Sequence, residues 1–490
     1  KISFTKMGFG KVDYNRSSDN AYAEAAKASM VGGGQRSFMT TKQPSHITIF
    51  NIANTMVGTA MLVTPLQFLQ AGIIPSLIAI LIVGWVNFKT CNLCIIHKLN
   101  YEGDLSEILE RIMGVRWKQA FLLSSIALMF VLGVAYFLLM LDPFYTILKG
   151  FSPSLPEPKH FTFAEFSYQW AAIILIVICF ALFSAPNLSL ILKLNSLGIL
   201  ALIVFLLFIF VTGFEAIFRG KVYFVTTDDG ASGFPLVSKD IITICGIFAL
   251  AFAIHNAIVQ IIRYNKDAKK NTRDLGLGYL LGSLIYAGVG IFGGFAVSWR
   301  PKCSAAEFKN HDSSTLMDCF TSDEPFSYYF MLVAAFFVLL HLATVIPIII
   351  FVVRNQALEL FFGTGRPPAW AFWGFNTLQT SFMLLAALLN VFPSTLLAID
   401  GAVCGFGLLY VVPIFLHFRA CFGVHEEDRE SGSHSSLRNP SLNKSEAHSE
   451  DNLAIDYKNQ ESWKTYGLYG SIFVFGFALM VFQLYQTFAQ

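Results

Sequence analysis

The sequence predicts an all-α polytopic membrane protein with two inverted repeats of five spans and an eleventh span after them. Hydrophobic residues make up 55% of the 490 residues and charged residues only 13%, a balance outside the range of soluble domains. Runs of about 20 apolar residues, enough to cross about 30 Å of hydrocarbon, occur eleven times. The first helix of each repeat contains a stretch that can be interrupted, which is typical of secondary transporters.

The apolar runs lie at 45–72, 73–96, 119–148, 168–186, 193–218, 241–263, 275–298, 327–353, 369–390, 394–418 and 464–488. An odd number of spans places the two termini on opposite sides. A cytoplasmic N-terminus puts most of the 34 Lys and Arg on the inner side, as the positive-inside rule requires. In a mitochondrial membrane this side is the matrix. The net charge of +2 argues against a large nucleic-acid-binding surface.

These runs divide the chain into six parts. They are a polar inner tail (1–45), the first repeat (46–218), an outer loop (219–240), the second repeat (241–418, with an outer loop at 299–325), a polar inner loop (419–463) and the last span (464–490). The tail is interpreted as a flexible segment or as one that plugs the inner mouth or docks a partner. The loop is rich in Ser, Asn and charge, so its composition predicts disorder.

The first span carries polar residues and a glycine at its middle, where a lipid-facing helix would carry leucine. Residues 54–59 read Asn-Thr-Met-Val-Gly-Thr. An unpaired backbone group in hydrocarbon costs several kcal/mol, so a helix breaks at membrane depth only where the break faces a cavity or a ligand. This stretch is therefore predicted to be a discontinuous helix whose freed amides and carbonyls hold a solute.

Two further stretches in the first repeat have local signals. Residues 101–116 are predicted to form a short amphipathic helix on the membrane surface, with Asp104 as its cap. Span three ends in Asp142-Pro143, where the proline is expected to interrupt the hydrogen-bond ladder and Asp142 to cap the piece that follows. An acid within the membrane is also a functional candidate, so both roles stay open for Asp142.

The second repeat offers the matching signals. Small residues alternate with large ones over 245–254 and precede the polar pair His255-Asn256, which predicts a break in span six. Span eight contains Thr344 one turn before Pro347, so it can offer oxygens to a small cation, or Thr344 can bond back to its own helix in a packed kink. Span ten carries a second intramembrane acid, Asp400.

The eight cysteines fall into two groups. Six lie in or at the ends of spans and are expected to pack as small apolar side chains; Cys91 and Cys94 form a CxxC that is only a weak metal or redox signal. Cys303 and Cys319 share the outer loop at 299–325, where a disulfide between them is expected and would imply an oxidising compartment.

In these stretches the chain resembles the amino acid/auxin permease family, and within it the sodium-coupled neutral amino acid transporters with their lysosomal members. The residues that carry the resemblance are 54–59, 65 and 70–72 in span one, 250–256 and 271–275 around span six, 344–354 in span eight and 401–405 in span ten. The resemblance implies a leucine-transporter-type fold with alternating access around a central site.

Position by position, the resemblance assigns roles to single residues. The amino acid would contact Thr55, Met56, Val57, Gly58 and Thr59, with Phe252 closing over it. Asn54 and Thr344 would bind a co-transported sodium ion, and no other metal or cofactor is implied. The physics agrees, because a half-helix N-terminus favours a carboxylate while free carbonyls favour ammonium or sodium. Asp142 and Asp400 stand where neutral residues are expected, which makes proton coupling an alternative.

We therefore expect a cation-coupled secondary transporter of amino acids, with sodium favoured as the co-substrate. Two alternatives remain open: an amino-acid sensor that engages a protein partner through 1–45, and a transporter-like structural subunit of a larger membrane assembly. The polar segment 422–462 is a second place for a protein partner. A lysosomal or vacuolar membrane is favoured over the plasma membrane or the mitochondrial inner membrane. The chain has no HExxH, GxSxG or P-loop motif, so an enzyme is not expected.

Overall fold

The computed structural model describes residues 43–58, 60–99, 102, 104–152, 154–155, 166–184, 188–225, 233–238, 241–263, 265–300, 316–320, 325–363, 367–430 and 463–489. Four of the sequence predictions concern residues outside these ranges, namely the tail up to residue 42, Thr59, Cys303 and the inner loop from 431 to 462. The tail's structure, the loop's predicted disorder and the disulfide partner of Cys319 therefore stay predictions.

Each apolar run contains a helix. The helices are α2 (Ser45–Met56), α3 (Ala60–Ala71), α4 (Ile73–Ile96), α5 (Leu105–Met113), α6 (Val115–Phe151), α7 (Tyr168–Phe183), α8 (Leu188–Phe218), α9 (Ile241–Ala251), α10 (His255–Ile262), α11 (Asn271–Val297), α13 (Pro325–Phe362), α14 (Ala369–Leu388), α15 (Pro393–Gly405), α16 (Val412–Glu430) and α18 (Trp463–Ala489). Short turns η1 (Ala268–Lys270) and η3 (Leu316–Cys319) are 3-10 helical, and η4 (Phe406–Val411) is a π-helix.

Eight segments of the described chain are long and apolar enough to cross a membrane, or nine when α2 and α3 count as one bent span. Helix α7, with 16 residues, is shorter, and α14 is not among the eight. The structure therefore has the character of a polytopic membrane protein. The eleven-span count and the five-plus-five repeat remain predictions.

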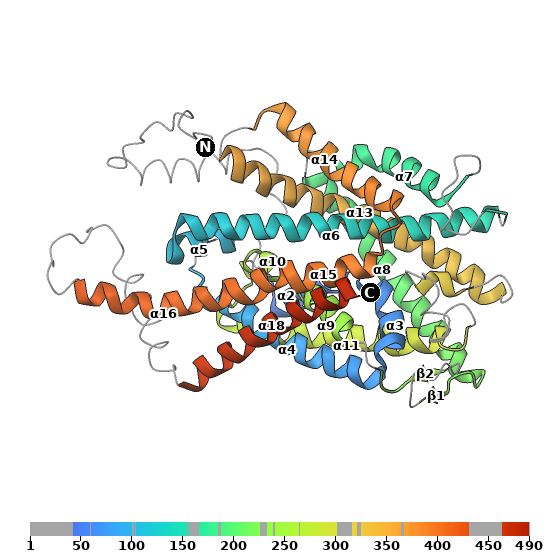
Figure 1. Ribbon diagram of the computed structural model, residues 1–490, viewed down its shortest axis with the longest axis horizontal. Coiled ribbons are helices and arrows are strands. Elements are labelled where there is room, and N and C mark those ends of the chain that lie inside the picture. Colours follow the sequence, from blue (N-terminus) through green and yellow to red (C-terminus); the bar gives the residue numbers. More distant parts are fainter. Residues whose placement is uncertain are drawn as a thin grey trace.

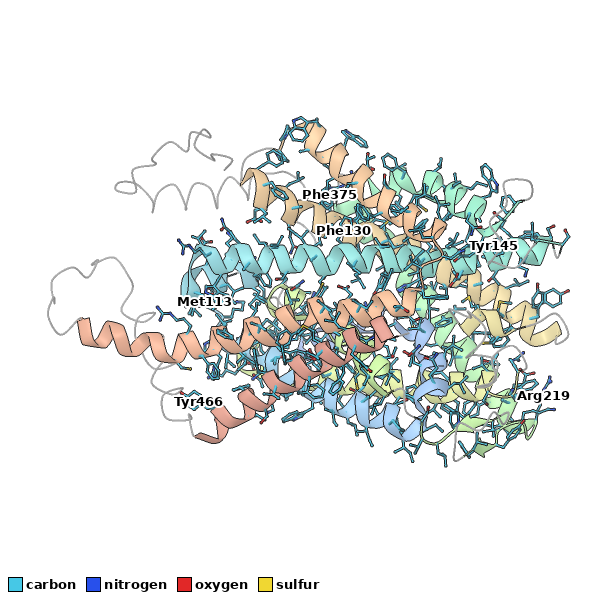
Figure 2. The ribbon with its side chains drawn as sticks, in the orientation of Figure 1. Met113, Phe130, Tyr145, Arg219, Phe375 and Tyr466 are labelled. Carbon is cyan, nitrogen blue, oxygen red and sulfur yellow. The ribbon has the colours of Figure 1, made fainter. Side chains whose placement is uncertain are left out.

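The long helices lie side by side along the longest axis of the molecule (Figure 1). Helix α5 and the end of α16 lie at one end, which we call the α5 end. The opposite end, which we call the β1 end, carries a short parallel pair of strands, β1 (Phe224–Val225) and β2 (Phe234–Pro235). Figure 2 places Met113 and Tyr466 toward the α5 end and Tyr145 and Arg219 toward the β1 end.

Helix α11 packs against the first span and its neighbours α4 and α8. Glycines make this possible: a Cβ added to Gly290 would overlap the Phe68 ring on α3, and one added to Gly293 would lie 2.5 Å from the Pro65 side chain. Without side chains at these positions, the two backbones approach closely. Both pieces of the broken first span, α2 and α3, pack against this one continuous helix.

Three details of the sequence prediction are corrected or refined here. Helix α6 runs unbroken through Pro143, because the single hydrogen bond that proline removes is outweighed by close packing of this stretch against α13 and α15. Helix α16 continues to Glu430 rather than ending near 418. Asp104 caps α5 as predicted, its carboxylate accepting from the Leu105 amide at 2.6 Å, but the apolar face of α5 packs against α6 and α16.

Candidate functional site

The first span breaks where the sequence predicts it. Helices α2 and α3 are bent by 64° relative to each other, with Val57 and Gly58 between them. The Val57 amide still donates to Ala53 O at 2.8 Å, but the carbonyl of Met56 leaves the helical ladder. Met56 and Val57 are buried and Gly58 is half-buried, whereas Thr55 is exposed, with its hydroxyl donating to Asn51 O at 2.7 Å.

Two tyrosines reach into this break. The Tyr286 hydroxyl on α11 donates to the freed carbonyl of Met56 at 2.8 Å. The Tyr136 hydroxyl on α6 lies next to Gly58, 3.0 Å from the place where a Cβ on that glycine would stand. A side chain from another helix, that of Tyr286, thus satisfies a carbonyl that the break sets free, as burial in a membrane protein requires.

The sixth span breaks at 252–254, between α9 and α10. Asn87 Nδ2 on α4 donates to Ala249 O at 2.9 Å, and the Tyr279 hydroxyl on α11 donates to Phe252 O at 3.0 Å. The sequence prediction of a break before His255 is therefore confirmed. Gly246 lies six residues before the break begins at Phe252 and has a packing role, since a Cβ there would meet Ala398 O on α15 at 2.9 Å.

The two breaks meet on one face of α11. A Cβ added to Gly282 would lie 3.2 Å from the Met56 Cε and 3.8 Å from the Phe252 ring, so both side chains lie beside this glycine. The fully buried Phe252 ring stacks on Tyr279 with centroids 5.9 Å apart and meets Tyr286 edge-on at 5.7 Å. Met56 and Phe252, nearly 200 positions apart in the sequence, therefore lie next to the same part of α11.

The polar pair His255-Asn256 belongs to the second break. Thr90 Oγ1 on α4 lies 2.9 Å from His255 Nε2. Asn256 Nδ2 donates to Ser125 Oγ on α6 at 3.0 Å, and Ser125 donates to Gln356 Oε1 on α13 at 2.9 Å. The pair is therefore a hydrogen-bonded part of the break, and its bonds tie α10 to three other helices.

The two predicted sodium ligands lie on different helices. Asn54 is half-buried on α2. Thr344 is 4% exposed on α13, and its hydroxyl donates to His341 O at 2.7 Å, so the back-bonded alternative is the one observed. The hydroxyl oxygen keeps its acceptor capacity. A cavity of about 10 Å³ lies one turn away between α3, α8 and α13, lined by Met61 and His341 among others.

The two intramembrane acids have different surroundings. The Asp142 carboxylate accepts a hydrogen bond from the Tyr168 hydroxyl, and Thr146 Oγ1 donates to the Asp142 backbone carbonyl at 2.8 Å. Asp142 therefore links α6 to α7 within an unbroken helix and does not cap a new one. Asp400 on α15 is 1% exposed, and neither carboxylate oxygen has a hydrogen-bond partner in the part of the chain that the structure describes.

The segment that enters α2 is fastened at the α5 end. Gln43 pairs with Asn265, and the Lys266 amide donates to Gln43 O at 2.8 Å. Asn265 Nδ2 and Arg273 Nη2 both donate to the Asp274 carboxylate, at 2.9 and 2.8 Å. The Asp274 side chain is fully buried and also accepts from the Ser45 hydroxyl. The start of α2 is thus held against the connection between α10 and α11.

The cysteines of the described residues are either free or disulfide-bonded. Cys91 and Cys94 are free and fully buried, in line with apolar packing. Cys319 is disulfide-bonded, and its pairing with Cys303 stays a prediction. Within the described ranges, no group of three His, Cys, Asp or Glu side chains is placed to hold a metal ion.

Sequence reasoning missed the side chains that complete the two breaks, above all Tyr136, Tyr279, Tyr286 and Asn87. A signal was present for two of them, because Tyr279 and Tyr286 are seven residues apart and so share one face of α11 with Gly282. Asn87 and Thr90 are polar residues in an otherwise apolar span, which also indicates a buried partner.

Residues 45–429 match the model of the family described as transmembrane amino acid transporter protein. The chain belongs to this transporter family. Its family is not one of enzymes, as the sequence predicted.

Relatives of this transporter include two proteins named neutral amino acid transporter 9. That of Danio rerio is 26% identical over 443 residues, covering 81% of this chain and 78% of the relative. That of Rattus norvegicus is 24% identical over 446 residues, covering 79% and 75%. A Caenorhabditis elegans protein named sodium-coupled neutral amino acid transporter 9 homolog is 23% identical over 438 residues, covering 77% and 68%.

Proposed function

We propose that this protein is a cation-coupled secondary transporter of amino acids that works by alternating access around the two helix breaks. The observation that carries the proposal is the convergence of Met56 and Phe252 on Gly282 of α11. Broken helices facing each other at membrane depth are the arrangement in which transporters bind small polar solutes. Family membership and the names of the relatives support the substrate class.

The amino acid is held by groups of the first break, with Phe252 closing over it. Backbone amides at the start of α3, following Gly58, favour the carboxylate, and the carbonyls at the end of α2 favour the ammonium group. Thr55 and Thr59 add hydroxyls to the same stretch. In the present conformation the Tyr286 hydroxyl donates a hydrogen bond to the Met56 carbonyl. When the substrate binds, its ammonium group replaces Tyr286 as the donor to this carbonyl.

Sodium is the proposed co-substrate, bound by Asn54 and Thr344. These residues supply an amide oxygen and a hydroxyl oxygen, both of which are suitable ligands for a hard cation. A coupling ion matters for a neutral substrate, because one charge moving through about 100 mV gains roughly 2.3 kcal/mol. Asp142 and Asp400 are the candidates for proton coupling in its place.

The orientation proposed is that of the positive-inside rule, with the α5 end on the cytoplasmic side. In this orientation the bonds from Gln43 and Ser45 to the α10–α11 connection close the route from the site to the cytoplasm. A lysosomal or vacuolar membrane is the proposed residence, following the lysosomal members that the sequence resembles.

Binding of a radiolabelled amino-acid panel to purified protein, with and without sodium, tests the proposal. Gly58→Val should abolish binding, because its side chain enters the break against Tyr136. Gly374→Val on α14 is the matched control, since no atom lies within 4 Å of a Cβ added there. Sodium-dependent binding in the wild type and the control, but not in Gly58→Val, is the expected result. If no amino acid binds, the transporter and sensor hypotheses are both wrong, and the hypothesis of a structural subunit is favoured.

A further inference from the structure

Asp400 is a buried acid without a positively charged partner among the described residues, and the Cys404 thiol is the side chain that interacts with its carboxyl group. Asp400 lies on α15 about 10 Å from the start of the helix at Pro393, given the 1.5 Å rise per residue. It is 1% exposed, and both carboxylate oxygens lack a hydrogen-bond partner among the described residues. The other intramembrane acid, Asp142, accepts a bond from Tyr168, so the two acids are in opposite situations.

Among the described residues, no Lys, Arg or His interacts with the Asp400 carboxyl to balance its charge. Helix α15 packs against α6, α9, α18 and η4 (Figure 1). Neither α9, α15 nor η4 contains a Lys or Arg. The Cys404 thiol, one turn further along α15, is the titratable group that interacts with the carboxyl. Buried titratable side chains on the neighbouring elements are Asp142 and Tyr145 on α6, Tyr410 on η4 and Tyr469 on α18, and Cys245 on α9 is half-buried.

The surroundings of Asp400 require a neutral side chain. Burying an ionised carboxylate without a partner is far more costly than burying a protonated one, and the group takes up a proton instead. We propose that Asp400 carries a proton in this conformation and is the proton-binding residue of the transport cycle. This inference rests on the proposed transport function and assigns it a second coupling ion.

The protonation state of Asp400 affects the contact between helices α9 and α15. Helices α15 and α9 touch backbone to backbone beside Asp400: a Cβ on Gly246 would meet Ala398 O at 2.9 Å, and one on Gly401 would overlap Gly246 O. An ionised Asp400 draws water to this contact and separates the two helices. Because α9 ends at Ala251, directly before Phe252, loss of the proton acts on the residue that closes the amino-acid site.

The π-helix η4 allows α15 to move without α16 when Asp400 gains or loses its proton. It begins directly after Gly405 and separates α15 from α16. A π-turn has weaker hydrogen-bond geometry than an α-helix and is a recurrent site of local adjustment in functional proteins. Asp400 takes one proton from water on the side of the β1 end, is neutral while the site is closed, and releases the proton to water on the other side.

Two measurements test this inference. In the first, the wild-type protein is treated with dicyclohexylcarbodiimide, which reacts with protonated buried carboxyl groups, and labelled residues are located by mass spectrometry. Label on residue 400 at neutral pH is expected, and label on residue 142 is not, because Tyr168 holds its carboxylate. An unlabelled Asp400 overturns the inference. This readout does not depend on transport.

In the second, amino-acid accumulation is measured in proteoliposomes under a pH gradient, with sodium equal on both sides. One coupled proton raises the accumulation of a neutral amino acid up to about tenfold per pH unit. Asp400→Asn should lose this response and the accompanying acidification of the lumen, while amino-acid binding stays. Asp142→Asn, the same chemical change, should keep the response.

The outcomes separate the two proposals. Accumulation driven by sodium but not by pH, equal in the wild type and Asp400→Asn, overturns the role of Asp400 and leaves the transporter intact. A wild type that binds no amino acid overturns the proposed function. If Asp400→Asn does not fold, the labelling of the wild type still decides whether Asp400 is protonated.

Discussion

Tyr286 is the residue that most changes the picture of the first break. Sequence analysis predicted that the carbonyls freed there would be open to a ligand, but the Tyr286 hydroxyl already satisfies that of Met56. Tyr279 does the same for Phe252 in the second break. A substrate ammonium group therefore competes with protein hydroxyls, and the net gain from binding is smaller than the bond itself.

Replacing Tyr286 by phenylalanine should tighten amino-acid binding. The change leaves the buried Met56 carbonyl without a partner in the empty site, which costs about 1–3 kcal/mol, whereas the bound substrate supplies a new donor. We expect Kd to fall by about tenfold and the thermal stability of the empty protein to fall as well.

Tyr410→Phe is the control for this measurement. Tyr410 is 1% exposed, and its hydroxyl makes no hydrogen bond in the described structure, so its loss should change neither quantity. Equal or weaker binding by Tyr286→Phe would mean that Tyr286 keeps the Met56 carbonyl when the substrate is bound.

Single residues in the site were predictable where they break a pattern within one span. Gly58 and the polar stretch around it stand out from their apolar neighbours, and so do Thr344 and Asp400. The partners did not stand out, because a tyrosine in a span is common and only the fold shows which carbonyl it reaches. Thr344 illustrates the same limit, since its sequence allowed both a cation ligand and a bond to His341 O.

At the scale of elements, α11 organises the site through its glycines. A Cβ on Gly278 would overlap the side chain of the fully buried Ile52 on α2, and one on Gly282 would lie 3.2 Å from the Met56 Cε. Ile52 is β-branched and its Cβ is fixed to the backbone, so it cannot turn away. The position of α2, and with it the first break, depends on these missing side chains.

Gly278→Ala should therefore destabilise the protein by about 1–3 kcal/mol, the usual cost of overpacking a core. Gly276→Ala on the same helix is the control. Its nearest neighbour is the Phe88 ring at 3.4 Å, an ordinary contact, so the better helix propensity of alanine should leave stability equal or slightly higher. Thermal unfolding in detergent measures both. A Gly278→Ala variant as stable as Gly276→Ala would show that α2 is not held by this contact.

The helices themselves were largely predictable, because eleven long apolar runs leave few other structures in a membrane. What failed was the effect of Pro143, which sequence rules place at a helix interruption. Such rules describe local cost, whereas the packing of α6 against α13 and α15 comes from residues more than 170 positions away. The π-turn at η4 was not predicted either, although Pro413 follows it within two residues and removes one amide donor from the helical ladder.

At the scale of the whole molecule, two buried titratable groups lie at different depths in the membrane, and acid has opposite effects on them. Asp400 is placed in the half of the span Pro393–Cys421 that begins at Pro393, toward the β1 end, and is proposed to need a proton. At the α5 end, His97 Nε2 lies 2.9 Å from His417 Nδ1 on α16, and Arg111 donates to His97 O at 2.7 Å. Burial, with His417 and Arg111 nearby, lowers the pKa of His97 to about 3.

This lowered pKa predicts that acid weakens the α5 end. The folded protein keeps His97 neutral down to about pH 3, whereas the unfolded chain protonates it near 6.5. The contribution of His97 to stability is therefore complete above pH 6.5 and is lost as the pH falls toward 3, by up to about 1.4 kcal/mol per pH unit. Thermal unfolding in detergent from pH 7.5 to 5 should show this loss, and His97→Gln should flatten it.

His46→Gln, at an exposed histidine at the start of α2, should retain the full pH dependence and serves as the control. A pH profile of His97→Gln identical to that of the wild type would show that the histidine pair does not hold α4 and α16 together. The prediction also bears on transport, because acid on the side of the β1 end should drive uptake through Asp400 while acid at the α5 end weakens the fold. Changing the pH on one side of a vesicle at a time separates the two effects.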